Sequence, residues 1–214
     1  MNEQKRLGEL KISKLLLEFS IPAIIGMVVN TLYNIIDRMF IGHIPDVGNL
    51  AIAGVGITMP LMTIIMAFGM LIGIGTATRI SISLGQHHKE KAEKFLGNAF
   101  SLIIIISILL TVVGLVFMDP LLRAFGASDN IIVYAEQYIE IIFAGCIFNI
   151  VGFGLNHSIR SDGSPKVAML SMLIGAITNI ILDPIFIFGL NLGVRGGAIA
   201  VSYTHLTLPT TERV

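Results

Sequence analysis

Long apolar stretches separated by short polar connections run through most of the chain. A helix needs about 20 mostly apolar residues to cross the hydrocarbon core of a bilayer. Five apolar stretches reach this length, and they cover approximately residues 15–40, 51–77, 96–118, 131–155 and 167–190. A sixth stretch begins near Gly197. The pattern predicts an all-α polytopic membrane protein, in which residues 15–200 form the membrane domain and residues 1–14 precede it as a polar segment.

The composition also favours a membrane protein. Of the 214 residues, 54% are hydrophobic and 13% are charged, whereas about 25% of the residues in an average soluble domain are charged. The 22 glycines suit helices that approach one another closely in lipid. The formal net charge is zero, so the overall charge gives no indication of a nucleic-acid partner.

Lysines and arginines are concentrated in alternate connections. The N-terminal segment, the second connection and the fourth connection contain Lys5, Arg6, Lys11, Lys14, Arg79, Lys89, Lys91, Lys94, Arg160 and Lys166. The other connections contain only Arg123 and Arg195. Because cytoplasmic connections of membrane proteins carry the excess of basic residues, we expect the N-terminus on the cytoplasmic side.

Polar side chains interrupt the first apolar stretch on one helical face. Spacings of three, one and three residues separate Asn30, Tyr33, Asn34 and Asp37, which places them on one side of a helix. Such a polar stripe faces protein or water rather than lipid, so Asn30 and Asn34 are expected to line a pathway. Pro22 lies in the same stretch and lacks a backbone donor, so we expect a hinge there.

The fifth stretch contains a second polar pair, Asn179 and Asp183, spaced by one helical turn. At 1.5 Å per residue, Asp37 and Asp183 both fall roughly 25–33 Å from the inner boundary of the membrane. Two acids on different helices are therefore expected at one level, and acids within membrane spans are usually functional. A purely structural explanation stays open for each acid: Asp37 could pair with Arg38 or face water, and Asp183 could end a helix before Pro184.

Other polar features predict packing or interfacial roles. The outer part of the fourth stretch is expected to form an interfacial belt of Tyr134, Glu136, Tyr138 and Glu140. Gly69 and Gly73 form a GxxxG pattern, which is typical of close helix packing. The sequence contains no Ser/His/Asp arrangement, phosphate-binding loop or cysteine metal cluster, so we do not expect an enzyme.

Four segments together resemble the N-terminal half of a MATE (multidrug and toxic compound extrusion) transporter. They read "IPAIIGMVVNTLYNIIDRMFIG", "LAIAGVGITMPLMTIIMAFGMLIGIGTATRISISLG", "IRSDGSPKVAML" and "TNIILDPIFIFGLNLGVRGGAIA". The resemblance covers roughly residues 8 to 200 and is strongest to the bacterial branch related to DNA-damage-inducible efflux proteins. It implies a bacterial cytoplasmic membrane protein with two six-helix lobes, of which this chain provides the first, up to the start of helix six.

The resemblance also implies a function and a site. Such transporters export cationic, amphipathic drugs in exchange for H⁺ or Na⁺, without a cofactor, and the second, C-terminal lobe is required. The implied cation site consists of Asp37, Asn179 and Asp183, with Tyr33 beside it. A threonine on helix six usually completes the site, and its place falls near Val201, so that ligand is missing.

Two further expectations concern the end of the chain and competing functions. Residues 201–214, "VSYTHLTLPTTERV", resemble a translated sequencing adapter, so we expect them to be non-native. The alternatives to a cation-coupled antiporter are a lipid-linked oligosaccharide flippase of related fold and a nonfunctional membrane fragment. A flippase is expected to show several basic residues that face the cavity, and Arg38 is the only Arg or Lys between residues 15 and 75.

Overall fold

The computed structural model describes residues 11–161 and 163–207, and all regular secondary structure within these ranges is helical. Most of the predicted N-terminal segment 1–14, and the end of the expected tail 201–214, lie outside the described residues. The elements are α2 (Ile12–Gly42), α3 (Gly48–Gly85), α4 (Lys89–Val116), α5 (Met118–Ala124), α6 (Asp129–Ala144), α7 (Cys146–Ser161), α8 (Pro165–Pro184), the π-helix η1 (Ile185–Gly189) and α9 (Val194–Thr207).

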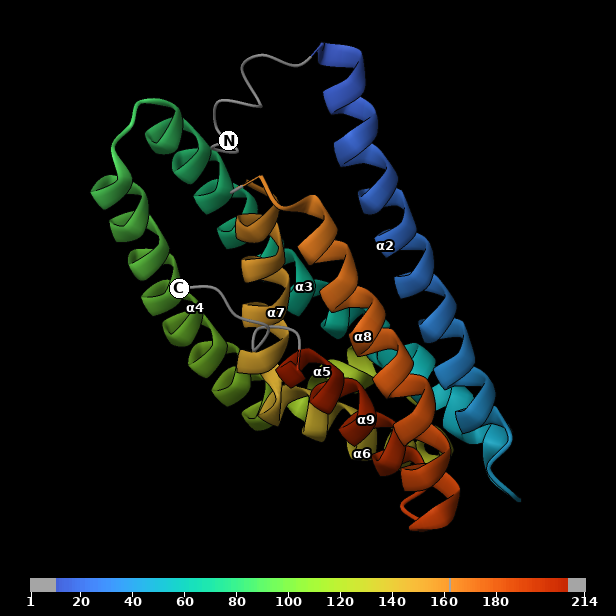
Figure 1. Ribbon diagram of the computed structural model, residues 1–214. Helices are drawn as coiled ribbons and strands as arrows, with labels where there is room; N and C mark the ends of the chain where they lie inside the picture. Colours follow the sequence, from blue (N-terminus) through green and yellow to red (C-terminus); the bar gives the residue numbers. More distant parts are fainter. Residues whose placement is uncertain (1–10, 162, 208–214) are drawn as a thin grey trace.

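The predicted spans correspond to long helices of one bundle (Figure 1). Within the described ranges, four helical segments are long and apolar enough to cross a membrane: α2, α3, α4 and α8 continued by η1. The bent pair of α6 and α7 makes up to a fifth crossing. α9 starts at Val194 and continues past Ala200 to Thr207, so the chain enters a sixth helix as expected.

The prediction of one continuous helix over residues 131–155 is wrong. The helix breaks at Gly145, and α6 and α7 meet there at an angle of 59°. A Cβ atom on Gly145 would lie 2.8 Å from the Ser202 Oγ, so this glycine lets α9 approach the break. On the other side, the Thr111 hydroxyl on α4 donates a hydrogen bond of 2.8 Å to the Phe143 carbonyl, which lies in the last turn of α6. The short helix α5, which the apolar pattern did not predict, lies in the preceding connection.

Close contact between α3 and α7 holds the centre of the bundle together. A Cβ atom on Gly73 would lie 2.9 Å from the Gly154 Cα, and one on Gly69 would lie 3.3 Å from the Phe153 Cβ. The prediction that Gly69 and Gly73 form a helix-packing motif is confirmed, because both glycines bring the α3 backbone against α7. α4 packs on the other side of α7, as Figure 1 shows.

The helix α2 lies at the edge of the bundle and packs mainly against α8 (Figure 1). Its outward face carries exposed apolar side chains, among them Leu16, Ile24, Met27, Val28 and Leu32. This face suits contact with lipid tails, since a soluble surface rarely exposes such a continuous apolar patch. α2 continues through the buried Pro22 as one helix, so the hinge at Pro22 stays a prediction.

After Asp183, the chain leaves α-helical geometry. Pro184 cannot donate a backbone hydrogen bond, and the following segment η1 is wound as a π-helix, in which the Leu190 amide donates to the Ile185 carbonyl at 2.8 Å. Gly196 on α9 lies directly against this segment, because its Cβ would come within 2.7 Å of the Phe186 carbonyl carbon. The end of α8 and the start of α9 are thereby packed backbone to backbone.

The contact between Gly73 and Gly154 predicts opposite effects for two glycines of one helix. Gly73→Ala should lower the melting temperature of the intact protein in detergent, because overpacking costs about 1–3 kcal/mol. Gly75 is the matched control, since no neighbouring atom among the described residues lies within 4 Å of its Cβ position. Gly75→Ala should leave the melting temperature unchanged or raise it, because alanine favours helix by about 1 kcal/mol. Equal shifts in the two variants would contradict the packing described here.

Candidate functional site

Two acidic side chains are buried where α2 and α8 face each other. Asp37 is 3% exposed and Asp183 is fully buried. The two carboxyl groups lie close enough to interact electrostatically. The structure therefore brings together the two acids that the sequence placed at one depth on different helices.

Three oxygen atoms of this acid cluster have no hydrogen-bond partner. Asn179 is fully buried one turn before Asp183 and donates its amide to Asp183 Oδ1 at 3.4 Å. Among the described residues, no donor reaches Asp37 Oδ1, Asn179 Oδ1 or Asp183 Oδ2. A buried polar atom without a partner costs free energy, about 1–3 kcal/mol for a neutral group and more for a charged one. The cluster is thus rich in acceptors and short of donors.

The helix α9 covers this cluster through a glycine. A Cβ atom on Gly197 would lie 3.2 Å from Asp37 Oδ1 and 3.1 Å from the Ile41 Cδ1. Any larger side chain at position 197 would therefore press on Asp37 and on the buried Ile41. The acid cluster is enclosed by three helices, α2, α8 and α9.

Two tyrosines lie within electrostatic range of the acids. Tyr33, one turn before Asp37 on α2, is 6% exposed, and Tyr138 on α6 is 2% exposed. The prediction of an interfacial belt is wrong for Tyr138, which lies on the buried face of α6 with Ala135 and Ile142. The spacing of these three residues, 135, 138 and 142, is typical of a core-facing stripe and could have revealed it. Glu140 lies on the opposite, exposed side of α6.

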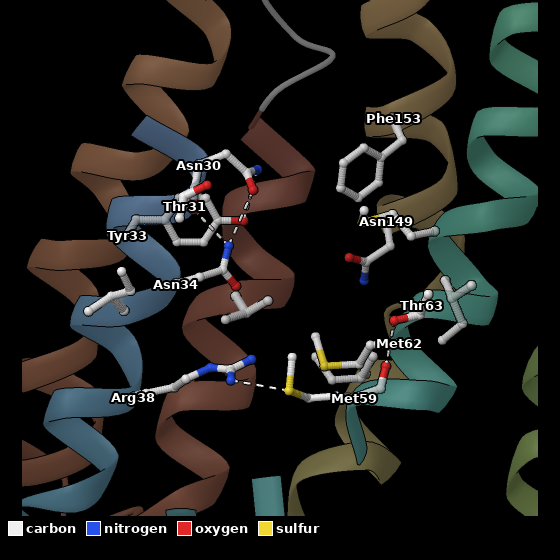
Figure 2. Close-up of a pocket in the computed structure, with 15 residues that line it drawn as sticks. Asn30, Thr31, Tyr33, Asn34, Arg38, Met59, Met62, Thr63, Asn149 and Phe153 are labelled. Atoms are coloured by element: carbon white, nitrogen blue, oxygen red, sulfur yellow. Dashed lines mark hydrogen bonds between the residues drawn. The ribbon is translucent and has the colours of Figure 1, made fainter. Parts of the chain in front are cut away.

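A cavity of about 390 Å³ opens beside the cluster, between α2, α3 and α7. Figure 2 shows polar side chains of α2 on one wall of this cavity and Asn149 and Phe153 of α7 on the other. Side chains of α3 complete it, and the lining residues are Asn30, Thr31, Tyr33, Asn34, Ile35, Arg38, Met59, Met62, Thr63, Ile65, Met66, Ile142, Asn149, Phe153 and Val201. Such a mixture of methionine, aromatic and amide groups suits a flexible, amphipathic ligand.

The polar stripe predicted on the first span divides between the cavity and the cluster. Asn30 and Asn34 line the cavity, and the Asn34 amide donates to the Asn30 carbonyl at 2.7 Å and to its side-chain oxygen at 3.3 Å. Asp37 is buried in the cluster. Tyr33 takes part in both, because it lines the cavity, lies near Asp37 and accepts a hydrogen bond of 3.5 Å from Asn30.

Some lining residues were not predicted from the sequence. Asn149 on α7 is 6% exposed and lies in an apolar stretch, where a single amide was the only signal. Arg38 was expected, on the structural explanation, to pair with Asp37; its guanidinium instead reaches Met59 on α3. Val201, at the position expected for the missing threonine, lines the cavity and offers no side-chain oxygen. Thr204, one turn later, is buried, and its hydroxyl donates to the Ala200 carbonyl at 2.7 Å.

The donor set of the cluster fits a proton or a hard cation. Carboxylate and amide oxygens are the ligands that Na⁺ and similar cations prefer, and Asp37, Asn179 and Asp183 each present one oxygen without a partner. A proton would serve the same purpose by neutralising one of the two carboxylates. The geometry accommodates either, and the role of these residues stays a prediction.

The chain matches the family model MatE over residues 22–185, which contain Asp37, Asn179 and Asp183. The chain belongs to the MATE family. The Multidrug export protein MepA of Staphylococcus haemolyticus strain JCSC1435 is 33% identical over 199 residues, which cover 92% of this chain and 43% of that protein. MepA of Staphylococcus aureus strain MRSA252 is also 33% identical, over 195 residues, or 90% of this chain and 42% of that protein.

Solved MATE structures share the fold. A crystal structure of MATE in the bent conformation superposes with a TM-score of 0.84 and 32% identity, covering 92% of this chain and 43% of that one. The outward-facing conformation of a multidrug resistance MATE family transporter gives the same TM-score and identity over 91% of this chain and 43% of its own. The chain thus has the fold of the N-terminal half of a MATE transporter and spans about 43% of the length of these relatives.

The crowding of acids in the cluster predicts that Asp37→Asn stabilises the MATE fold. An amide at position 37 removes one buried charge and, with it, the electrostatic repulsion that Asp37 exerts on Asp183. The melting temperature in detergent should therefore rise. Asp46→Asn is the matched control, because Asp46 is exposed in a turn at φ 64°, which asparagine also tolerates. A fall in melting temperature for Asp37→Asn would show that the carboxylate is not under electrostatic stress.

Proposed function

We propose that this chain is the N-terminal lobe of a cation-coupled antiporter that exports amphipathic drugs or toxins in exchange for H⁺ or Na⁺. The observation that carries the proposal is the buried cluster of Asp37, Asn179 and Asp183 directly beside a cavity suited to an amphipathic ligand. Membership of the MATE family, and the multidrug export relatives, support the same function.

The cluster supplies a physical reason for coupling. Two carboxylates buried close together repel each other and lack water, so the closed packing of α2, α8 and α9 favours a bound cation or proton. Without a bound cation or proton, separation of the same helices is favourable because water can then reach the carboxylates. The cation thereby biases the equilibrium between two packings, which is the requirement for alternating access.

Tyr33 is the proposed link between the cation and the exported compound. Tyr33 lies within electrostatic range of Asp37 and also lines the cavity. Movement of α2 on release of the cation would therefore change the shape of the cavity wall that holds the drug. A monovalent cation that moves down a membrane potential supplies about 2.3 kcal/mol per 100 mV, enough to support a tenfold or greater gradient of the exported compound.

The proposed location is the bacterial cytoplasmic membrane, with the N-terminus inside. Figure 1 places the start of α2, the α3–α4 connection and the α7–α8 connection at one end of the bundle. The basic residues Lys89, Lys91 and Lys94 belong to this end, as do Arg160 and Lys166. Such a concentration of positive charge supports a cytoplasmic position for this end.

A lipid-linked oligosaccharide flippase is less well supported. Its pyrophosphate substrate requires several cations in the cavity. Of the residues that line this cavity, only Arg38 is basic. A single arginine matches one singly charged anionic group rather than a pyrophosphate.

Removal of the first acid tests the coupling. Asp37→Asn in a full-length transporter containing this chain should abolish drug resistance in a susceptible bacterial host, because one of the two charges that bind the cation is lost. Expression in the membrane should be unchanged, and Asp46→Asn should retain resistance. Resistance at the wild-type level with Asp37→Asn would remove the basis of the proposed mechanism.

The identity of the cation is tested by thermal unfolding in NaCl and in KCl at equal concentration. If Na⁺ is the coupling ion, NaCl should raise the melting temperature and KCl should not. At a Na⁺ concentration tenfold above the dissociation constant, binding increases the free energy of unfolding by about 1.4 kcal/mol. Asp183→Asn and Asn179→Ala should each abolish the difference, because each removes an oxygen ligand. Identical unfolding of the wild type in the two salts would assign the coupling to H⁺ instead.

A further inference from the structure

Arg38 is the one charged side chain among the residues that line the cavity. It follows Asp37 directly in α2, but successive helical residues point about 100° apart. Asp37 is buried against α8 and α9, whereas Arg38 extends across the cavity toward α3. Figure 2 shows this guanidinium at one end of the cavity, with Asn34 and Tyr33 farther along the same wall.

The guanidinium of Arg38 is poorly matched by its neighbours. Its Nη1 donates to the sulfur of Met59 at 3.2 Å, and a thioether is only a weak acceptor. The ion pairs among the described residues are Lys89–Glu93, Arg123–Asp119 and Arg123–Asp129. Arg38 is in none of them, so most of its five donors are available for an anionic group.

The charge of Arg38 determines which ligands the cavity favours. A cation in the cavity is repelled by the guanidinium, whereas the carboxylate of Asp37 is almost completely buried and is not among the lining residues. A carboxylate gains two parallel hydrogen bonds from an arginine, which is its strongest common partner in proteins. The remaining lining suits the rest of an amphipathic molecule, since Asn30, Asn149 and Thr63 offer hydrogen bonds and the methionines and Phe153 offer apolar surface.

We propose that Arg38 makes this cavity selective for zwitterionic amphipathic compounds, whose carboxylate pairs with the guanidinium, over compounds of the same shape that carry only a positive charge. The role of this selectivity in export rests on the proposed function. Binding itself does not, because a carboxylate can pair with the guanidinium of Arg38 whether or not the cluster exchanges a cation. The proposal narrows the cationic class that the family resemblance implies.

The test uses a matched pair of fluorescent ligands, Nε-dansyl-lysine and its methyl ester. The first is a zwitterion. In a mildly acidic buffer, in which the α-amino group of the ester is protonated, the second keeps the positive charge but lacks the carboxylate. Dansyl fluorescence reports binding to the full-length transporter in dodecyl maltoside, a detergent without phosphate. The wild type should bind the zwitterion at least tenfold more tightly than the ester. Arg38→Gln should abolish this difference because it weakens binding of the zwitterion.

Controls separate charge from structure. Arg38→Lys should retain part of the preference, because it keeps the charge but loses the bidentate geometry. Arg195→Gln removes an exposed arginine at the start of α9 and should leave the preference unchanged. The thermal shift induced by the coupling cation should persist in Arg38→Gln and be lost in Asp183→Asn.

Several results would overturn the selectivity. They are equal affinity of the wild type for the two ligands, a preference that survives Arg38→Gln, or no saturable binding of the zwitterion. A phospholipid headgroup could supply an anionic oxygen instead, so soluble dihexanoylphosphatidylcholine is added as a competitor. Arg38-dependent binding of this lipid without binding of the zwitterion would assign the guanidinium to lipid phosphate and refute the proposal. In each of these cases, an intact cation-induced shift would leave the proposed antiport standing.

Discussion

The crowding of two carboxylates in a space enclosed by α2, α8 and α9 is the constraint on which the rest of the lobe depends. Asp37 is almost completely buried and Asp183 is fully buried, and together with Asn179 they present three acceptor oxygens without donors among the described residues. Such an arrangement is unfavourable by itself, so a positive partner would stabilise the packing of the three helices. The remainder of the bundle forms a rigid support for these three helices. The glycine contacts between α3 and α7 hold the centre, while α2 stands at the edge with its packing concentrated on α8.

The cavity and the acid cluster share the polar side of α2. Asn30 and Asn34 line the cavity, and Asp37 follows them along the same side of the helix, in the cluster. Because both sites belong to one helix, a single displacement of α2 affects both. The proposed coupling between cation and drug then needs no chain of intermediate residues between distant sites, since Tyr33 already lies between the two.

Much of the architecture could be predicted from the sequence because lipid imposes a simple rule on composition. The spans appear as apolar stretches, and the pairs Gly69/Gly73 and Asn179/Asp183 appear at helical spacings of four. The break at Gly145 could not be predicted, because the neighbour that packs against it, Ser202, belongs to a helix more than 50 residues later. The sequence also did not indicate where Arg38 points: an adjacent acid suggested an ion pair, whereas tertiary packing turned the two side chains apart. Tyr138 was placed at the interface because of its polar neighbours, although its spacing from Ala135 and Ile142 indicates the core.

The glycine at position 197 has a kinetic consequence. Its backbone lies against Asp37 without an intervening side chain, so the covering of the acid is a helix rather than a movable rotamer. On this side, a side-chain rotation cannot uncover the acid, and α9 and α2 would have to part as whole elements. Such collective motions take microseconds to milliseconds, far longer than a rotamer flip. In the proposed antiporter, the dwell time of a bound ion would therefore be set by the opening of the helices, and leakage of ions between transport cycles would be slow.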